Sequence, residues 1–318
     1  MRLPRFDHYR PTTVEEAVAV LGANPGARVL AGGTDLLVNM KNRLETPPVL
    51  VSLKGIGSLR AVGTEDGATV IGAGSTLKQI QNDAGLAERF PALVEAARSV
   101  GSYRHQTMGT LAGNLCQNTR CRFFNQSLEW RSVRPLCYKA GGDFCHVMNK
   151  ENVCYCTYSG DVAPALLVLD ARVRVQGLDG VREFPLAELY SGEGKSPLTL
   201  GPSDVVTAVV IPDASAAGRS SYQKHALRGA IDFPVVGAAV WIGGGVVRAA
   251  FTAVDRGPVR APALEEALQG RELKESILAE VAPLSRKAAT VTRTTMVSGT
   301  HKRELMAALF VRAARSLL

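Results

Sequence analysis

LCQNTRCRFFNQSLEWRSVRPLCYKAGGDFCHVMNKENVCYCTYSGDVAPALLVLD, residues 115–170, is the stretch around which this chain is organised. All six cysteines of the 318-residue chain lie within it, at positions 116, 121, 137, 145, 154 and 156. Cysteines that merely fill a core would be scattered along the sequence. Their confinement to one segment therefore indicates a shared chemical role.

Disulfides and metal binding are the first two explanations for such a cluster. Disulfides belong to chains that enter oxidising compartments. The first residues, MRLPRFD, lack the apolar core of a secretory signal, and no run elsewhere is apolar enough to span a membrane. We therefore expect a cytoplasmic chain, in which clustered cysteines more often bind a metal or take part in redox chemistry.

The spacing of the cysteines helps to choose between metals. Zinc ribbons contain two close cysteine pairs, whereas here only Cys154 and Cys156 are close. Separate loop segments suit the corners of an iron–sulfur cluster better, and such a cluster needs four thiolates. Spacing alone favours iron–sulfur over zinc only modestly. Cys116, which continues a Gly-Asn-Leu run, and Cys156, beside Cys154, are interpreted as the two surplus cysteines.

Length and charge set broader bounds. The chain is long enough for two domains, or three, and its apolar content is that of an ordinary globular protein. The net charge of +8 is spread along the chain, without a Lys/Arg run or an aromatic-rich basic motif. A basic, solvated surface explains this better than nucleic-acid binding does.

The N-terminal half alternates strand-like and helix-like segments. A helix is expected to start within residues 12–16, strands are expected at 28–31, 49–53 and 68–74, and helices at 77–84 and 90–100. Gly32 and Gly33 follow the first strand and precede a helical segment, a context in which backbone amides can face a phosphate. For the two glycines taken alone, a tight turn without a ligand is favoured over a phosphate site. Residues 107–114 form a second loop of glycine and hydroxyl residues, for which the alternatives are a ligand-binding loop and an ordinary turn.

The C-terminal half is richer in strands. They are expected at 172–175, 205–212, 220–226, 235–242 and 246–254, with helices from residue 263 onward. Residues 213–219 are small and polar, as at a domain boundary. A small antiparallel sheet backed by helices is therefore predicted after that boundary.

Three loops together resemble the FAD-binding subunits of the molybdenum hydroxylases. They read AGGTDLL at 31–37, TLAGNL at 110–115 and GDVAPALLVLDA at 160–171. The resemblance implies an α+β fold of the xanthine dehydrogenase and vanillyl-alcohol oxidase type. An FAD-binding domain of two subdomains would span residues 1–214, and a smaller α+β domain with an antiparallel sheet and helices would span 215–318. An iron–sulfur insertion would lie at about 117–157.

That insertion resembles one branch of the family, the flavin and iron–sulfur subunits of 4-hydroxybenzoyl-CoA reductases. The shared runs include NLCQNTRC, NQS, WRS, CHV and YSGDVAPAL. Matching residue by residue implies a 4Fe–4S cluster whose ligands are Cys121, Cys137, Cys145 and Cys154.

The same matching implies a set of FAD-binding residues. Ala31, Gly32, Gly33, Thr34, Asp35, Leu36, Leu37 and Val38 would hold the diphosphate; Thr110, Ala112, Gly113 and Asn114 would lie along the flavin; Asp161 and Lys224 would contact FAD. Ala112 departs from the family pattern, which usually has glycine there. Taken alone, Asp161 would be interpreted as a turn-capping residue, and Lys224 could equally be a solvated strand residue.

The resemblance also implies a function without any ring chemistry on this chain. Electrons would pass from ferredoxin through the 4Fe–4S cluster and FAD to 2Fe–2S clusters on a small subunit. They would then reach a molybdenum cofactor on a large subunit, where 4-hydroxybenzoyl-CoA is dehydroxylated to benzoyl-CoA, in a dimer of heterotrimers. One alternative is the FAD subunit of another molybdenum hydroxylase with a different aromatic substrate, and another is a zinc-stabilised assembly module.

Overall fold

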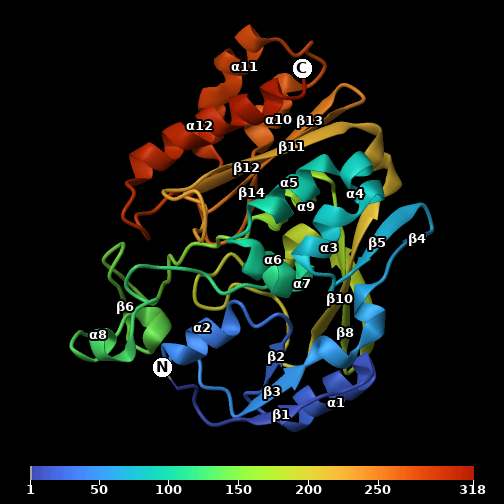
Figure 1. Cartoon of the computed structure of the whole chain (residues 1–318). Helices are drawn as coiled ribbons and strands as arrows, with labels where there is room; N and C mark the ends of the chain where they lie inside the picture. The colour runs from blue at the N-terminus through green and yellow to red at the C-terminus, as the bar shows by residue number, and fades with distance from the viewer. Residues whose placement is uncertain (1) are drawn as a thin grey trace.

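The computed structural model describes residues 2–318 and begins with a small α/β unit (Figure 1). Its strands β1 (Asp7–Tyr9), β2 (Arg28–Leu30) and β3 (Val49–Ser52) form a parallel sheet in the order β1-β3-β2. Helix α1 (Val14–Ala23) begins after Thr13, whose side chain accepts a hydrogen bond from the Glu16 N–H. Its buried face packs with β3 into a small core, and α2 (Leu36–Lys41) follows the glycine loop.

A second, antiparallel sheet stands next to this unit. Its order is β4-β5-β10-β8-β9, formed by β4 (Val62–Glu65), β5 (Ala68–Gly72), β8 (Arg172–Gly177), β9 (Gly180–Pro185) and β10 (Val205–Pro212). Strand β8 alternates between buried and partly exposed residues, as a strand with one covered face should. The helices associated with this sheet are α3 (Leu77–Asn82), α4 (Ala84–Arg89), α5 (Pro91–Ser99), α6 (Tyr103–Met108), α7 (Leu111–Leu115) and the fully buried α9 (Val162–Val168).

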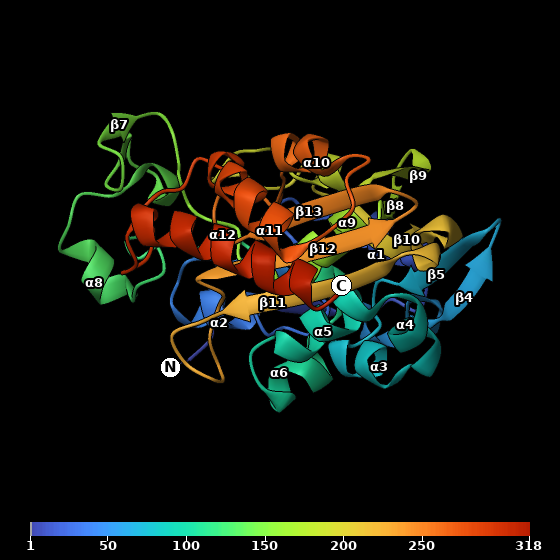
Figure 2. The ribbon, with the colours of Figure 1, turned by 90° about the horizontal axis from the view of Figure 1, so that it is seen from above.

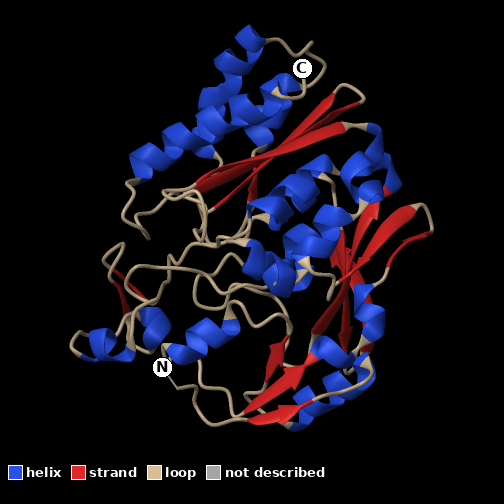
Figure 3. Cartoon of the chain, in the orientation of Figure 1, coloured by secondary structure: helices blue, strands red, loops and turns tan. Residues whose placement is uncertain are grey.

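The C-terminal part is a third sheet with helices on both faces (Figures 1 and 3). Strands β11 (Arg219–His225), β12 (Val236–Gly243), β13 (Val246–Thr252) and β14 (Val259–Arg260) pair antiparallel in chain order. Helices α10 (Pro262–Leu268), α11 (Glu275–Val281) and α12 (Gly299–Arg315) cover the outer face, and α5 and α9 pack on the inner face. The predicted antiparallel sheet backed by helices is therefore present.

The cysteine-bearing segment projects from one side of the molecule and is mostly loop (Figures 2 and 3). It contains only the short α8 (Leu128–Ser132) and the hairpin of β6 (Phe144–Cys145) and β7 (Lys150–Glu151). At its base, a β-bridge joins Arg120 to Thr157, and the Arg122 N–H donates to the Thr294 carbonyl at 2.8 Å. The insert is thus attached to the C-terminal part as well as to the flanking chain.

Several element boundaries differ from the sequence-based expectation. The helix expected at 77–84 ends at Asn82, and a further helix that was not expected, α4, begins after Asp83, which caps it by accepting the Leu86 N–H. The last strand expected to reach residue 254 ends at Thr252, since Ala253 has the left-handed φ of 65°. Strands β1, β4 and β9 and helix α6 were not expected. Among residues 2–318, no helix combines the length and apolar character that crossing a bilayer requires.

Candidate cofactor site and cysteine cluster

A cleft of about 550 Å³ lies between the first two parts of the molecule. Both glycine loops line it, the first with residues 31–36 and the second with Thr110, Ala112 and Gly113. Gln117 and Asn118, at the start of the insert, also line the cleft. Most of residues 195–206 line it as well. The volume falls in the range of small-molecule and cofactor sites. Loops far apart in the sequence therefore meet around one ligand-sized space.

The first glycine loop packs closely against residues Met108 and Gly109 at the start of the second loop. A Cβ on Gly32 would collide with the Met108 carbonyl at the end of α6. Gly33 has a φ of +75°, a conformation that glycine adopts without strain. The glycines are therefore required for the two loops to lie against each other, which the sequence alone did not indicate.

The second loop is held by hydrogen bonds to the β5–α3 connection. The Thr110 side chain accepts the Gly113 N–H at 3.1 Å and caps the short α7. The Ala112 N–H donates to the Ala73 carbonyl at 3.0 Å. The Ala112 methyl lines the cleft, so the departure from glycine at this position is accommodated in a formed loop.

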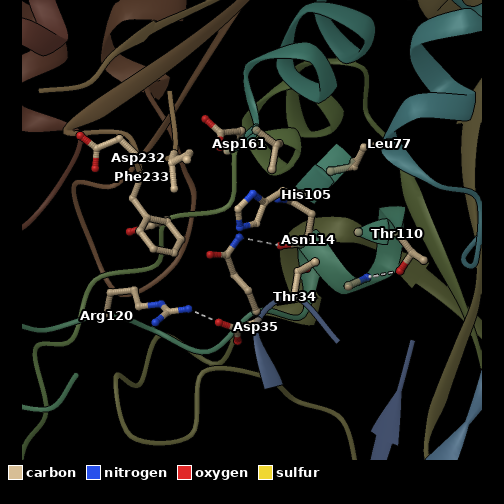
Figure 4. Close-up of a pocket in the computed structure, with 17 residues that line it drawn as sticks. Thr34, Asp35, Leu77, His105, Thr110, Asn114, Arg120, Asp161, Asp232 and Phe233 are labelled. Atoms are coloured by element: carbon tan, nitrogen blue, oxygen red, sulfur yellow. Dashed lines mark hydrogen bonds and ion pairs between the residues drawn. The ribbon is translucent and has the colours of Figure 1, made fainter. Parts of the chain in front are cut away.

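A smaller cavity of about 130 Å³ adjoins the cleft and reaches the C-terminal part (Figure 4). Thr34, Asp35, Thr110 and Gly113 line both spaces, and Asn114 and Asp161 line only the inner one. The Asn114 Oδ1 accepts the Val162 N–H at 3.1 Å, which fixes the loop to the start of α9. We call this space the inner cavity.

Asp161 is a buried carboxyl paired across the domain boundary. Only 3% of the residue is exposed, and its Oδ1 lies 3.2 Å from the Lys224 Nζ. The Tyr222 hydroxyl donates to the same oxygen at 2.8 Å. Burial raises the pKa of Asp161, and the Lys224 charge and the Tyr222 hydrogen bond oppose that rise. Lys224 is therefore a partly buried ion-pair partner and not a solvated strand residue.

Among the residues of the inner cavity that were not identified from the sequence are Gln117, Arg120 and Phe233. Arg120 pairs with Asp35 of the first loop, and its guanidinium lies 4.6 Å from the centroid of the Phe233 ring (Figure 4). Gln117 donates to the Asn114 carbonyl at 3.1 Å, but its buried Oε1 has no partner among the described residues. Gln117 and Arg120 stand in the NLCQNTRC run, which was the available signal.

The buried Gln117 Oε1, which has no hydrogen-bond partner among the described residues, is evidence on whether a cofactor fits this site. A buried acceptor without a partner is unfavourable, and a hydroxyl or ring N–H of a bound ligand would satisfy it. FAD carries both kinds of donor. The residues that line the cleft and the inner cavity therefore fit FAD, with polar groups at both ends and backbone close to the ligand space.

Most of the residues expected to bind FAD line either the cleft or the inner cavity. Residues 31–36 line the cleft, and Thr110, Gly113, Asn114 and Asp161 line the inner cavity. Leu37, Val38 and Lys224 line neither space. Lys224 reaches the site through Asp161, while Leu37 and Val38 belong to the first turn of α2.

Four thiols gather in the insert, and one of them was expected to be surplus. The Cys156 thiol hydrogen-bonds to Cys121 and Cys154. These hydrogen bonds lower the pKa of Cys121 and of Cys154 to about 7, while the pKa of Cys156 rises well above its usual value. Cys137 packs against this group. We call these residues, Cys121, Cys137, Cys154 and Cys156, the thiol cluster.

Cys145, the remaining expected ligand, lies beside the thiol cluster and is not part of it. It is buried on β6, one residue after Phe144, which forms a β-bridge with Cys137. All six cysteines are free, and in residues 2–318 no three His, Cys, Asp or Glu side chains are arranged to hold a metal ion. The expected ligand set is therefore only partly brought together: Cys156, expected to be a surplus cysteine, lies in the thiol cluster, and Cys145 lies outside it.

Lys139 connects the thiol cluster to the cleft. Its ammonium is near the cluster thiols and donates to the Asn118 Oδ1 at 2.7 Å and to the Gly194 carbonyl at 2.8 Å. The Asn118 N–H in turn donates to Asp35 at 3.0 Å. A short chain of polar contacts thus runs from the thiols to the first glycine loop.

Comparisons with known proteins agree with this architecture. The family described as FAD binding domain in molybdopterin dehydrogenase matches residues 4–214, and the CO dehydrogenase flavoprotein C-terminal domain matches residues 221–317. The chain is 31% identical over 246 residues to the aldehyde oxidoreductase FAD-binding subunit PaoB of Escherichia coli, covering 74% of this chain and 77% of that protein. It is 28% identical over 235 residues to the nicotinate dehydrogenase FAD-subunit of Eubacterium barkeri, covering 73% of this chain and 67% of that one.

Solved structures share the whole fold. A chain of the carbon monoxide dehydrogenase from Hydrogenophaga pseudoflava superposes with a TM-score of 0.80 at 24% identity, covering 100% of this chain and 98% of that one. The Cu,Mo-CO dehydrogenase gives a TM-score of 0.81, also at 24% identity, covering 100% and 99%. The expected fold, an FAD-binding domain followed by a smaller domain of mixed helix and sheet, is confirmed. This chain belongs to the FAD-binding medium subunits of the molybdenum hydroxylase family.

Proposed function

We propose that this subunit binds FAD across the cleft and the inner cavity and passes electrons to partner subunits. Residues 31–38 would hold the diphosphate, and Thr110, Ala112, Gly113 and Asn114 would lie along the flavin, with Asp161 and Lys224 at its inner end. The observation that carries this proposal is the meeting of both glycine loops and Asp161 around adjoining spaces, with the unpartnered Gln117 oxygen between them. A bound flavin accepts two electrons and can release them singly.

We further propose a 4Fe–4S cluster ligated by Cys121, Cys137, Cys145 and Cys154. The resemblance of the insert and the gathering of three of these thiols support it. The fourth expected ligand, Cys145, lies beside the thiol cluster, and Cys156 is the fourth cysteine within it. Loading would therefore require Cys145 to turn toward the other thiols.

Serine variants of individual cysteines test the ligand set. We expect Cys137→Ser and Cys145→Ser to lose the iron and sulfide, because either change removes one of four thiolates. Cys156→Ser should keep both, and all three variants should keep FAD, since none of these residues lines the cleft or the inner cavity. Iron retained in Cys145→Ser and lost in Cys156→Ser would instead assign Cys156 as the fourth ligand.

The proposed complex is a 4-hydroxybenzoyl-CoA reductase, arranged as a dimer of heterotrimers with a large molybdenum subunit and a small 2Fe–2S subunit. Ferredoxin would be the electron donor. The insert carries this proposal, because its motifs resemble that branch of the family. Activity of the purified complex on a panel of acyl-CoA thioesters, with a reduced viologen as donor, tests it. Turnover of other aromatic substrates, with no turnover of 4-hydroxybenzoyl-CoA, would contradict it.

Two alternatives are distinguished by the same preparation. The relatives include FAD subunits of nicotinate dehydrogenase and aldehyde oxidoreductase, which favours a different molybdenum hydroxylase as the second candidate. A zinc-stabilised assembly module would contain about one zinc and no iron. Activity on the acyl-CoA panel separates the two molybdenum hydroxylases. Anaerobic purification followed by iron, sulfide, zinc and flavin counts separates a flavin and iron–sulfur subunit from a zinc module.

We also propose that the domains divide at residues 214 and 215, with the insertion at about 117–157. The family matches at 4–214 and 221–317 support this division, as does the change from the second sheet to the third between β10 and β11. The site then lies between domains, because Asp161 belongs to the first and Lys224 to the second.

A further inference from the structure

Tyr222 lies beside the proposed FAD site without lining either space. Its hydroxyl donates to the Asp161 carboxylate at 2.8 Å, and only 4% of the residue is exposed. Tyr222 and Lys224 are two residues apart on β11, so their side chains leave the same face of the strand. Both therefore reach Asp161 from the C-terminal domain.

The Tyr222 hydroxyl is held in place by its surroundings. The Tyr222 backbone N–H donates to the Glu95 carboxylate at 2.6 Å, which anchors this part of β11 to α5. On the neighbouring strand, a Cβ at Gly237 would collide with the Tyr222 hydroxyl, so glycine leaves the room that this ring needs. The phenol is thus confined with its hydroxyl directed at Asp161.

Lys224 divides its hydrogen bonds among several acceptors. Its ammonium donates to the Ser99 carbonyl at 2.9 Å and to the Asp232 carbonyl at 3.0 Å, besides its contact with Asp161. The Tyr222 hydroxyl adds a shorter contact to the same carboxylate. A buried carboxylate without enough donors would take up a proton, so the Tyr222 hydrogen bond bears directly on the charge of Asp161.

We propose that Tyr222 is a positioning residue for the flavin: its hydroxyl keeps the Asp161 carboxyl ionised and oriented at the inner cavity, and thereby sets how the flavin reduction potential varies with pH. This inference rests on the proposed FAD site and adds a residue that acts through Asp161. A negative charge beside a flavin disfavours electron uptake, so protonation of Asp161 raises the flavin potential.

Other groups face the same region and must be considered in a pH profile. Lys224 shares β11 with Tyr222, and Tyr158 precedes α9 next to Asp161. The remaining titratable or charged residues that line the inner cavity are His105, Asp35, Arg120 and Asp232. Besides Tyr222 and Lys224, whose side chains donate to Asp161, the Ser99 side chain also forms a hydrogen bond that lowers the pKa of Asp161.

The test compares Tyr222→Phe with Tyr190→Phe in the flavin-loaded complex. Tyr190 is a matched control, since its buried hydroxyl donates to the Leu115 carbonyl and Tyr158 and not to Asp161. The flavin midpoint potential would be followed by absorbance over roughly pH 5 to 9. We expect both variants to retain flavin, and Tyr222→Phe alone to move the pH inflection upward by about one unit, because one donor to the ionised carboxyl is lost.

A double-mutant cycle assigns the effect to Asp161. Asp161→Asn should remove the inflection, and Tyr222→Phe should then have no further influence on the pH profile. A wild-type profile in Tyr222→Phe, an equal shift in Tyr190→Phe, or a persistent shift in the Asp161→Asn background would overturn the proposal. If Asp161→Asn does not fold, the comparison of the pH profiles of Tyr222→Phe and Tyr190→Phe decides whether the proposal holds. A wild-type complex that binds no flavin would overturn the FAD site itself and this inference with it.

Discussion

Single residues in this protein acquire their roles from distant parts of the chain. The glycine and hydroxyl residues of both loops could be identified from sequence, because their own neighbours form the pattern. Gln117 and Arg120 stand in the NLCQNTRC run, but neither their roles nor that of Tyr222 follow from a local pattern. Arg120 pairs with the distant Asp35 and Tyr222 with the distant Asp161, while the Gln117 oxygen is buried without a partner among the described residues. A residue whose significance lies in one long-range contact leaves no periodic signal.

The thiol cluster illustrates the same limit. Sequence spacing separated Cys154 from Cys156 as ligand and bystander, but both thiols point into one group. Residues that are two positions apart in an extended segment face the same way. The i, i+2 spacing of Cys154 and Cys156 therefore brings their thiols to the same side. Closeness to Cys154 instead made Cys156 a surplus cysteine in the sequence-based prediction, and the resemblance implied the same four ligands.

Lys302 is a buried lysine whose effect on stability depends on pH. Only 1% of it is exposed, and its ammonium donates to the Ala253 carbonyl at 2.8 Å. Burial lowers its pKa from 10.5 to about 8. Between those values the unfolded chain holds a proton that the folded chain has lost, so the free energy of unfolding rises with pH.

We therefore expect this lysine to destabilise the protein fully below about pH 8, and the penalty to disappear as the pH approaches 10.5, a gain of about 3 kcal/mol. Urea unfolding at several pH values measures it. Lys302→Met should remove this rise, whereas Lys287→Met, at an exposed lysine, should keep it. Equal pH slopes in wild type and Lys302→Met would contradict the assignment.

At the level of elements, caps decide where the helices around the site begin. Thr76 and Gln79 form a capping box on α3, Asp83 caps α4, and Thr110 caps α7. The helix predicted at 77–84 ran past Asp83, and α4 was not predicted. The capping aspartate between them was the signal for the break.

Thr110 gives an element-scale prediction. Thr110→Val removes the acceptor of the Gly113 N–H, so α7 should lose its cap at a cost of about 1 kcal/mol and the loop should bind FAD more weakly. Thr110→Ser keeps the hydroxyl and should behave like the wild type. Urea unfolding and titration of the apoprotein with FAD measure both effects. Equal FAD affinity in the two variants would show that the cap does not hold the loop for its ligand.

At the scale of the whole molecule, Thr294, a buried residue of the C-terminal domain, holds the base of the insert through two contacts. The Thr294 hydroxyl lies 2.5 Å from the Thr157 hydroxyl, and the Thr294 carbonyl accepts the Arg122 N–H. Next to Thr157, the Tyr158 N–H donates to the Asp255 carbonyl at 2.9 Å. These contacts keep the thiol cluster in a fixed relation to the FAD site.

Thr294→Val should loosen that attachment. The isosteric change leaves the Thr157 hydroxyl without its buried partner, so we expect faster amide hydrogen exchange across residues 117–157 and unchanged exchange in β11–β13. Thr290→Val, at an exposed threonine nearby in the chain, is the control. Uniformly faster exchange throughout the C-terminal domain would indicate global destabilisation and not a local hinge.

The sequence by itself determined which local elements form and which family the chain resembles, because turns, caps and alternating apolar residues act over a few neighbouring positions. It also located the loops that meet around the cleft. Only the tertiary structure decided which side chains complete the site: Gln117 with a free oxygen, Lys224 as the ion-pair partner of Asp161, and Cys156 inside the thiol group. The physical reason is that burial, pairing and pKa depend on groups brought together from separate elements, and no local pattern records that approach.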